Sequence, residues 1–247
     1  MNRQPAPKPR NTSASEALLD RMVGSRVSQA ISVAARLGIA DLLDGEARSC
    51  AALAQATNAH PGALYRLLRA LASVGIFAEE GDGRFRWTPL AECLRTDSPV
   101  SVRDYAILLG EEWCWRPWGR LLHSVESGAP AFEHVFGIQI FEYLAQSPGA
   151  AAVFDAAMSS RGNLEDETVV AAHDFDRGTI IDVGGGRGSL IAAILRQNPT
   201  ARGILFDLPH LQERAAELLR KLICPAGGSW SREISLTVCR QAATFIS

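Results

Sequence analysis

The chain has 247 residues, 47% of them hydrophobic, and a formal net charge of -2. This length allows one large or two ordinary domains with a sizeable core, and the near-neutral charge argues against a general polyanion binder. No run of about 18 apolar residues could span a membrane and no charged-then-apolar leader opens the chain, so we expect a cytoplasmic protein without membrane contact.

Five cysteines are scattered without Cys-x-x-Cys spacing, at Cys50, Cys93, Cys114, Cys224 and Cys239. This pattern favours reduced thiols over disulfides or a metal site, so no metal ligands are predicted.

Residues 1–15 contain three prolines and no long apolar side chain beyond Met1. They are predicted to form a disordered tail. From Glu16 onward, apolar residues recur mostly at three- and four-residue steps, which predicts a helix through Leu37 that ends at Gly38. A helix this apolar must bury against a core or a second subunit.

The segment from Ser49 to Leu94 is typical of a winged helix. A short helix follows Ser49, a second begins at Pro61, and two short apolar runs flank Glu79-Glu80-Gly81-Asp82-Gly83 as a hairpin. DNA binding through Arg66 and Arg69 is the alternative. Residues 46–95 carry six arginines against five acids, however, and the wing tip is acidic, so few phosphate contacts are available.

A helical connector is predicted over residues 101–173. Its three tryptophans, Trp113, Trp115 and Trp118, favour packing over a ligand cage because each ring buries a large area. Phe154 and Met158 lie one helical turn apart, with Arg161 on the same side; a Phe and Met pair at this spacing is also common in an ordinary core.

The most informative stretch runs from Thr179 to Pro209. A β-branched run enters three consecutive glycines and leaves into a second apolar segment, which predicts strand, tight turn and helix. The glycines allow a sharp turn and the close approach of a ligand. A second short strand then delivers Asp207 to its carboxyl end, where a carboxylate can accept both ribose hydroxyls.

The spacing of this turn separates two classes of ligand. A dinucleotide site requires Gly-x-Gly-x-x-Gly facing a pyrophosphate, but Ser189 stands where the third glycine would be. Asp182, two residues before Gly184, would repel a pyrophosphate and suits a cationic ligand. An NAD-type oxidoreductase therefore remains only the alternative.

The segment from Asp182 to Gly188 resembles motif I of S-adenosylmethionine-dependent methyltransferases. With the winged helix before it, the layout is similar to small-molecule O-methyltransferases of plant phenolic and bacterial polyketide pathways. Further similarity is carried by Arg66-Leu-Leu-Arg-Ala-Leu, Trp113 with Trp118, Gly128-x-Pro-Ala-Phe132 and Phe141-x-Tyr-Leu.

The resemblance implies an α/β protein whose N-terminal half is mainly α. It consists of a winged-helix dimerisation domain (16–100), the connector (101–173) and the start of an incomplete Rossmann-like domain (174–223). The implied partners are a second copy of the chain and a small hydroxylated aromatic substrate, without nucleic acid. The implied S-adenosyl-L-methionine site comprises Asp182, Gly184, Gly186, Asp207 and Leu208, and the implied acceptor site comprises Phe154, Met158 and Arg161.

The resemblance fades after Asp207, although residues 210–222 suit an amphipathic helix. Residues 224–247 are predicted to form an atypical tail. The family's Gly-Asp-Phe strand end and its Leu-His-Asp-Trp segment, whose histidine is the general base, do not occur in this sequence. We therefore predict no catalytic residue, expect the chain to be inactive as it stands, and retain a non-catalytic dimerisation or regulatory protein as a further alternative.

Overall fold

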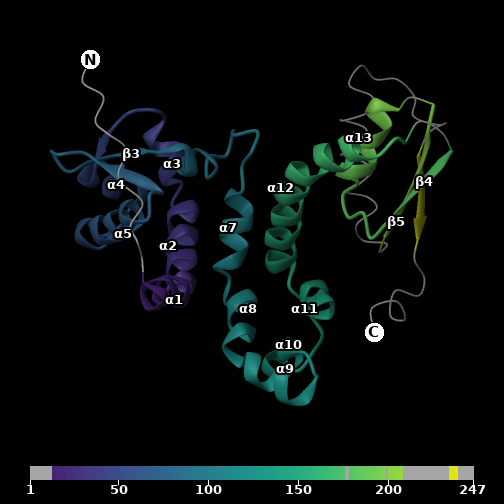
Figure 1. Cartoon of the computed structure of the whole chain (residues 1–247), viewed down its shortest axis with the longest axis horizontal. Coiled ribbons are helices and arrows are strands. Elements are labelled where there is room, and N and C mark those ends of the chain that lie inside the picture. Colours follow the sequence, from purple (N-terminus) through teal and green to yellow (C-terminus); the bar gives the residue numbers. More distant parts are fainter. Residues whose placement is uncertain (1–12, 176–177, 199, 208–233, 239–247) are drawn as a thin grey trace. The chain divides into compact units, whose positions relative to one another are not determined.

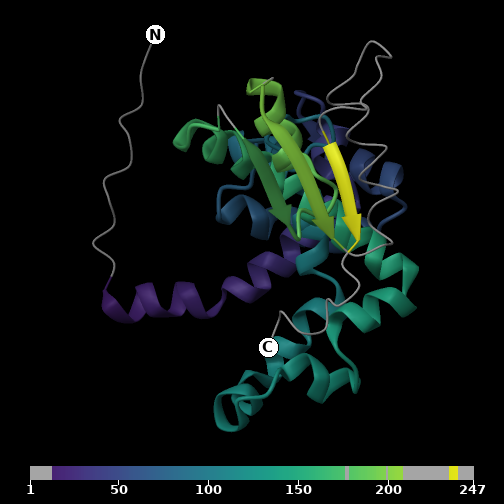
Figure 2. The same ribbon diagram turned by 90° about the vertical axis from the view of Figure 1, so that its right-hand side faces the viewer.

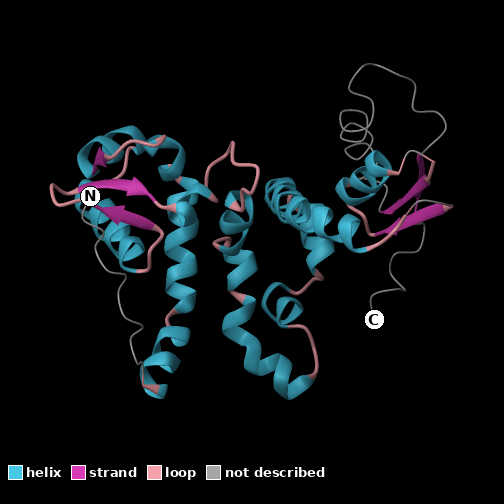
Figure 3. Cartoon of the chain, turned by 45° about the horizontal axis from the view of Figure 1, so that its top comes forward, coloured by secondary structure: helices cyan, strands magenta, loops and turns pink. Residues whose placement is uncertain are grey.

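The computed structural model describes residues 13–175, 178–198, 200–207 and 234–238, without the side chains of 161–165 and 234–238. The chain divides into two compact units, Met1–Leu90 and Ala91–Ser247. Helices make up most of the chain up to Ala172, and a parallel sheet follows (Figures 1 and 3). No helix among the described residues is both long and apolar enough to cross a membrane.

The first unit begins with α1 (Ala14–Met22), α2 (Gly24–Arg36) and α3 (Ile39–Leu43). Helix α1 starts earlier than predicted because Ser13 and Glu16 form a capping box, each side chain accepting from the other's amide. The single predicted helix from Glu16 to Leu37 is wrong in its continuity. It breaks at Val23, because the following Gly24 is a poor residue for a helix interior.

The winged-helix prediction is confirmed by the next elements, which are β1 (Arg48–Ser49), α4 (Cys50–Thr57), α5 (Pro61–Ser73), β2 (Phe77–Glu79) and β3 (Arg84–Trp87). Strand β3 pairs antiparallel with β2 and with the two-residue β1. The core of this unit includes Leu53, Leu68, Leu71, Phe77 and Phe85, each at most 1% exposed.

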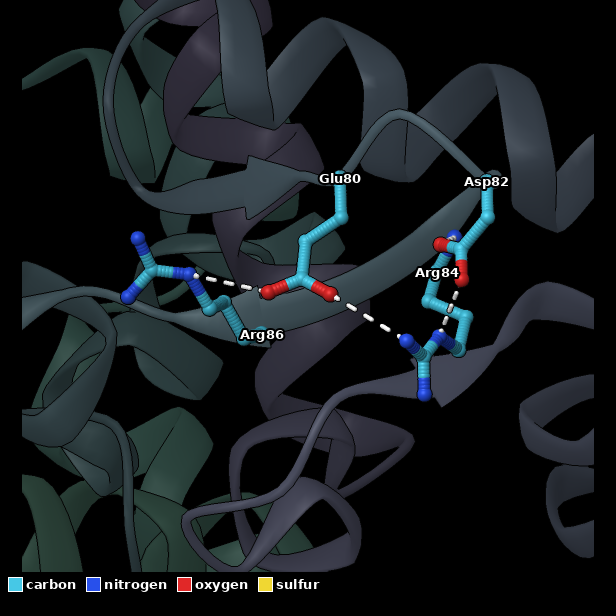
Figure 4. A network of polar contacts seen from close by, with 4 residues as sticks. All are labelled: Glu80, Asp82, Arg84 and Arg86. Carbon is cyan, nitrogen blue, oxygen red and sulfur yellow. Dashed lines mark hydrogen bonds and ion pairs between the residues drawn. The ribbon is translucent and has the colours of Figure 1, made fainter.

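The wing tip carries its own compensating charges (Figure 4). The Arg84 Nε lies 2.6 Å from Asp82 Oδ2, and the Arg86 Nε lies 3.5 Å from Glu80 Oε1. The Arg84 amide also donates to Asp82 Oδ1 at 3.2 Å, and this bond is the main reason that the pKa of Asp82 is lowered. Arg84 and Arg86 are thus paired with acids of the same hairpin, which leaves the wing tip poorly suited to contact the phosphates of DNA.

The boundary between the units falls within α6 (Pro89–Glu92), and a series of helices follows in the second unit. They are α7 (Arg103–Leu109), α8 (Glu112–Trp115), η1 (Pro117–Arg120), α9 (Leu121–Ser127), α10 (Ala131–Phe136), α11 (Ile140–Gln146) and α12 (Pro148–Ala172). Of the three tryptophans, Trp113 is buried at 5% exposure and packs with Leu108, Leu144 and Ala157. Trp115 and Trp118 are exposed, so only one of the three serves the core.

A three-stranded sheet follows, with β4 (Thr179–Val183), β5 (Arg202–Asp207) and β6 (Ile234–Val238) parallel in that order (Figure 2). Helix α13 (Ser189–Gln197) connects β4 to β5, and its Ala193 and Ile194 pack against Val170 of α12. The strand β6 lies in the segment predicted as an atypical tail. Its Ile-Ser-Leu-Thr-Val alternation fits a strand, although it resembles no family motif.

Candidate functional site

The glycine-rich turn between β4 and α13 forms as the sequence predicts. Gly184, Gly186 and Gly188 have φ values of 74°, 58° and 80°, a region that L side chains rarely adopt. A Cβ added at Gly184 or Gly186 would meet no atom of the described residues within 4 Å, apart from those of its chain neighbours. The backbone of these two residues therefore borders open space, into which a ligand can approach closely.

Asp207 lies at the carboxyl end of β5 and holds the turn directly. Its Oδ2 accepts a 2.7 Å hydrogen bond from the amide of Gly186, 21 residues earlier in the chain. The amide of Gly184 donates to the carbonyl of Phe206 at 2.8 Å, which extends the β4–β5 ladder into the turn. The parallel pairing of β4 and β5 thus brings two predicted cofactor residues, Gly186 and Asp207, into contact.

Asp182 lies below the turn on β4 and is half-buried. Its Oδ2 atom is buried and has no hydrogen-bond partner among the described residues. Burial raises the pKa of the carboxyl, and the neighbouring charges of Asp166 and Asp207 raise it further, although the amide of Ile191 acts in the opposite direction. A Cβ at Gly185 would collide with this carboxyl group and with Leu205, which explains why glycine is needed at the middle of the turn.

The charges around the turn favour a cationic ligand. Asp166 and Asp207 both raise the pKa of Asp182, so a positive group placed beside Asp182 would relieve the repulsion that they exert on its carboxylate. A pyrophosphate would increase it. The orphaned oxygen of Asp182 and the open backbone of the glycines fit the sulfonium and ammonium groups of S-adenosylmethionine, and Asp207 fits its ribose.

The predicted acceptor residues lie on α12. The ring of Phe154 is half-buried and meets Phe141 edge to face at 6.4 Å between centroids, whereas Met158 is 36% exposed. Arg161 belongs to α12, but its side chain lies outside the described set, as does the whole of Leu208. Phe154 and Met158 lie four residues apart on α12 and so share a helix row.

The sequence analysis did not identify three residues beside the turn, which are Asp166, Arg187 and its partner Ser159. Asp166, on α12, is only 8% exposed and is one of the charges that raise the pKa of Asp182. Arg187, within the turn, donates from Nη1 to Ser159 Oγ of α12 at 3.3 Å. No spacing rule marks these residues, because they lie 16 and 28 positions from their partners and meet them only through the packing of α12 on the sheet unit.

Two family models cover most of the chain. An O-methyltransferase dimerisation domain matches residues 13–97, and an O-methyltransferase domain matches residues 118–228. The crystal structure of LaPhzM superposes with a TM-score of 0.82 and 41% identity over 92% of this chain and 67% of that one. The chain belongs to the O-methyltransferase family. Strand β6 lies beyond both matched regions.

Other members of the family are similar over the same part. The phenazine O-methyltransferase PhzM of Lysobacter antibioticus is 45% identical over 206 residues, which are 83% of this chain and 60% of the relative. The structure of NcsB1, an O-methyltransferase from neocarzinostatin biosynthesis with S-adenosylmethionine and 2-hydroxy-5-methyl naphthoic acid bound, gives a TM-score of 0.67 and 30% identity, covering 86% of this chain and 64% of that one. The chain thus spans about 60% of the length of the curated relatives that it matches.

Proposed function

We propose that this chain provides the dimerisation region and the cofactor half-site of an S-adenosylmethionine-dependent O-methyltransferase. Its acceptor is a hydroxyl group of a small aromatic secondary metabolite. The observation that supports this proposal best is that a half-buried Asp182, whose Oδ2 has no hydrogen-bond partner among the described residues, lies beside a glycine turn held by Asp207. Scattered cysteines without pair spacing suit a reducing cytoplasm.

In this proposal the chain's own residues bind and orient the cofactor. Gly184 and Gly186 allow the methionine end to lie against the backbone, Asp182 faces its positive groups, and Asp207 accepts the ribose hydroxyls while it holds Gly186. When bound, the cofactor supplies a methyl group already activated by the sulfonium. Two requirements remain: alignment of the acceptor oxygen, which can contribute a large part of the rate, and removal of the hydroxyl proton by a general base.

The acceptor side is assigned to α12. Phe154 offers an aromatic face and Met158 a polarisable, partly exposed thioether, and both groups pack well against a flat ring. Support also comes from relatives whose names describe aromatic substrates, among them a 3-amino-4-hydroxybenzoate 4-O-methyltransferase of Streptomyces cremeus at 36% identity. Leu208 and Arg161 keep their proposed places in the cofactor and acceptor sites.

We assign the dimer to residues 16–100. Helix α1 presents Leu18, Leu19 and Met22 at 58–68% exposure, an apolar row that a second copy could cover. Light scattering should give twice the chain mass at tens of micromolar. Replacement of both Leu19 and Met22 by Glu should shift the monomer–dimer equilibrium towards the monomer. A native chain that is monomeric at this concentration would contradict the assignment.

Calorimetry with S-adenosylhomocysteine and NAD⁺ tests the cofactor. We expect saturable binding of the former and none of the latter, because Asp182 repels a pyrophosphate. Replacement of Asp182 by Asn should weaken the binding of S-adenosylhomocysteine, which keeps the positive ammonium group of the methyl donor. Preferential binding of NAD⁺ would overturn the proposal in favour of an oxidoreductase.

A further inference from the structure

Arg187 connects the glycine-rich turn to α12. Its Nη1 donates to Ser159 Oγ at 3.3 Å, and the same hydroxyl donates to the carbonyl of Asp155 at 2.8 Å, one turn earlier in the helix. The contact joins residues 28 positions apart, and both side chains are partly buried. It lies within the second unit, so it does not depend on the placement of the winged helix.

The tethered part of α12 is the part that carries the proposed acceptor residues. Asp155 and Ser159 form the helical row next to that of Phe154 and Met158, since each member follows its counterpart by one residue. A force that moves Ser159 along or around the helix therefore moves Phe154 and Met158 with it.

The guanidinium is held in a specific place rather than free in solvent. Its Nε is buried and has no hydrogen-bond partner among the described residues, which is a cost that an exposed arginine would avoid. The residues on either side of Arg187 are also held: the amide of Gly186 donates to Asp207, and the amide of Gly188, the N-cap residue of α13, donates to the carbonyl of Gly185 at 2.8 Å. The turn is thus hydrogen-bonded on one side to the end of β5, through Asp207, and on the other side to the middle of α12, through Ser159.

We infer that Arg187 is a positioning residue that transmits the occupancy of the glycine-rich turn to α12 through Ser159. A ligand that orders the turn then also orders the helical row that carries Phe154 and Met158. These two acceptor residues therefore reach their final positions only after the cofactor binds. This inference rests on the proposed function, because the ligand of the turn is taken to be the methyl donor or its product.

Hydrogen exchange of the full chain, with and without saturating S-adenosylhomocysteine, tests this link. In the native chain we expect the ligand to slow exchange around residues 154–160 by about tenfold, the size that one charge-assisted hydrogen bond can supply. Arg187→Met and Ser159→Ala should abolish this slowing while the ligand still binds at the turn. Arg187→Lys, which keeps a charged donor, should restore part of it.

Matched controls are present in the same elements. Ser160 also donates to a carbonyl of α12 but receives no bond from Arg187, and Arg196 is an exposed arginine of α13. Ser160→Ala and Arg196→Met should respond to the ligand as the native chain does. If Arg187→Met unfolds the chain, Ser159→Ala carries the test, because it removes only one hydroxyl group.

The possible results separate the two proposals. A native chain that takes up no S-adenosylhomocysteine would refute the cofactor assignment and this inference with it. A native chain that binds the ligand, while Arg187→Met and Ser159→Ala retain the slowing at α12, would refute the inference alone. A lower melting temperature in these variants with the slowing intact would show that the contact has a structural role only.

Discussion

The wing tip and the glycine-rich turn are both tight turns rich in glycine and acidic residues. The acids of the wing tip are paired with arginines, whereas Asp182 beside the glycine-rich turn is paired with no arginine that the structure describes. At the wing, Asp82 and Glu80 face Arg84 and Arg86 of the same hairpin, and the pKa of Asp82 is lowered. At the turn, Asp182 is half-buried, its Oδ2 has no hydrogen-bond partner within the described part of the chain, and its pKa is raised. An acidic turn that is neutralised from within has a structural role, whereas one that leaves its charge unpaired is suited to bind a cation.

The largest difference between the two turns should appear when a methyl group is added to each. In Gly185→Ala the new Cβ would overlap the Asp182 carboxyl and the Leu205 side chain, so we expect destabilisation by about 3 kcal/mol or more and loss of ligand binding. The new Cβ of Gly81→Ala at the wing would meet no atom of the described residues within 4 Å, so this change should leave both stability and ligand binding unchanged. Urea unfolding and calorimetry measure the pair, and equal effects at the two positions would contradict the structure.

Removal of one carboxylate from each turn should give the next largest contrast. Asp207→Ala deletes the acceptor for the Gly186 amide and, on the proposed function, for the ribose hydroxyls. We expect S-adenosylhomocysteine affinity to fall by about 2 kcal/mol, or roughly 30-fold. Asp82→Ala should leave the affinity unchanged. If calorimetry shows the same affinity for Asp207→Ala and the native chain, Asp207 does not belong to the site.

Local signals in the sequence were sufficient for elements that fold on local rules. The hairpin, the helix that begins at Pro61 with His60 as its cap, and the glycine turn follow from spacing, caps and positive-φ requirements. The break at Val23 was missed because the apolar period continues across it, and the period outweighed the signal of Gly24. Strand β6 was missed because resemblance to a family was given more weight than its alternating pattern.

The contacts of the candidate site also fall into those that the sequence could predict and those that it could not. The contact of Asp207 with Gly186 could be expected, since parallel strands end at one edge of a sheet. Asp166 and Arg187 could not, because nothing in the sequence specifies which face of the 25-residue α12 meets the turn. That face depends on how α12 packs against α13, a property of the folded unit rather than of any short motif.

The pH dependence of stability should have opposite signs at the two turns. The raised pKa of Asp182 means that the folded state binds more protons than the unfolded state above the ordinary Asp value, so its contribution falls as pH rises through that window. Asp182→Asn should therefore make the ligand-free chain more stable at pH 7 and flatten this part of the profile. The pKa of Asp82 is lowered, so Asp82 stabilises the folded state at pH values above the ordinary pKa of aspartate, and this stabilisation is lost as pH falls. Asp82→Asn should remove this dependence on pH. Urea unfolding between pH 3 and pH 8 would expose a wrong sign at either residue.

The smallest effect is expected from the ion pairs that neutralise the wing. Glu80 and Arg86 are 3.5 Å apart with side chains 36% and 58% exposed, so solvent and salt screen their attraction. A double-mutant cycle with Glu80→Ala and Arg86→Ala should give a coupling of about 0.5 kcal/mol or less, and it should decline further in 1 M salt. The same added salt should weaken ligand binding at the turn only modestly, since burial shields Asp182 from the ions that screen the wing. A coupling of several kcal/mol at the wing would mean that its charges are held as tightly as those of the turn, and the contrast between the two turns would then no longer mark the ligand site.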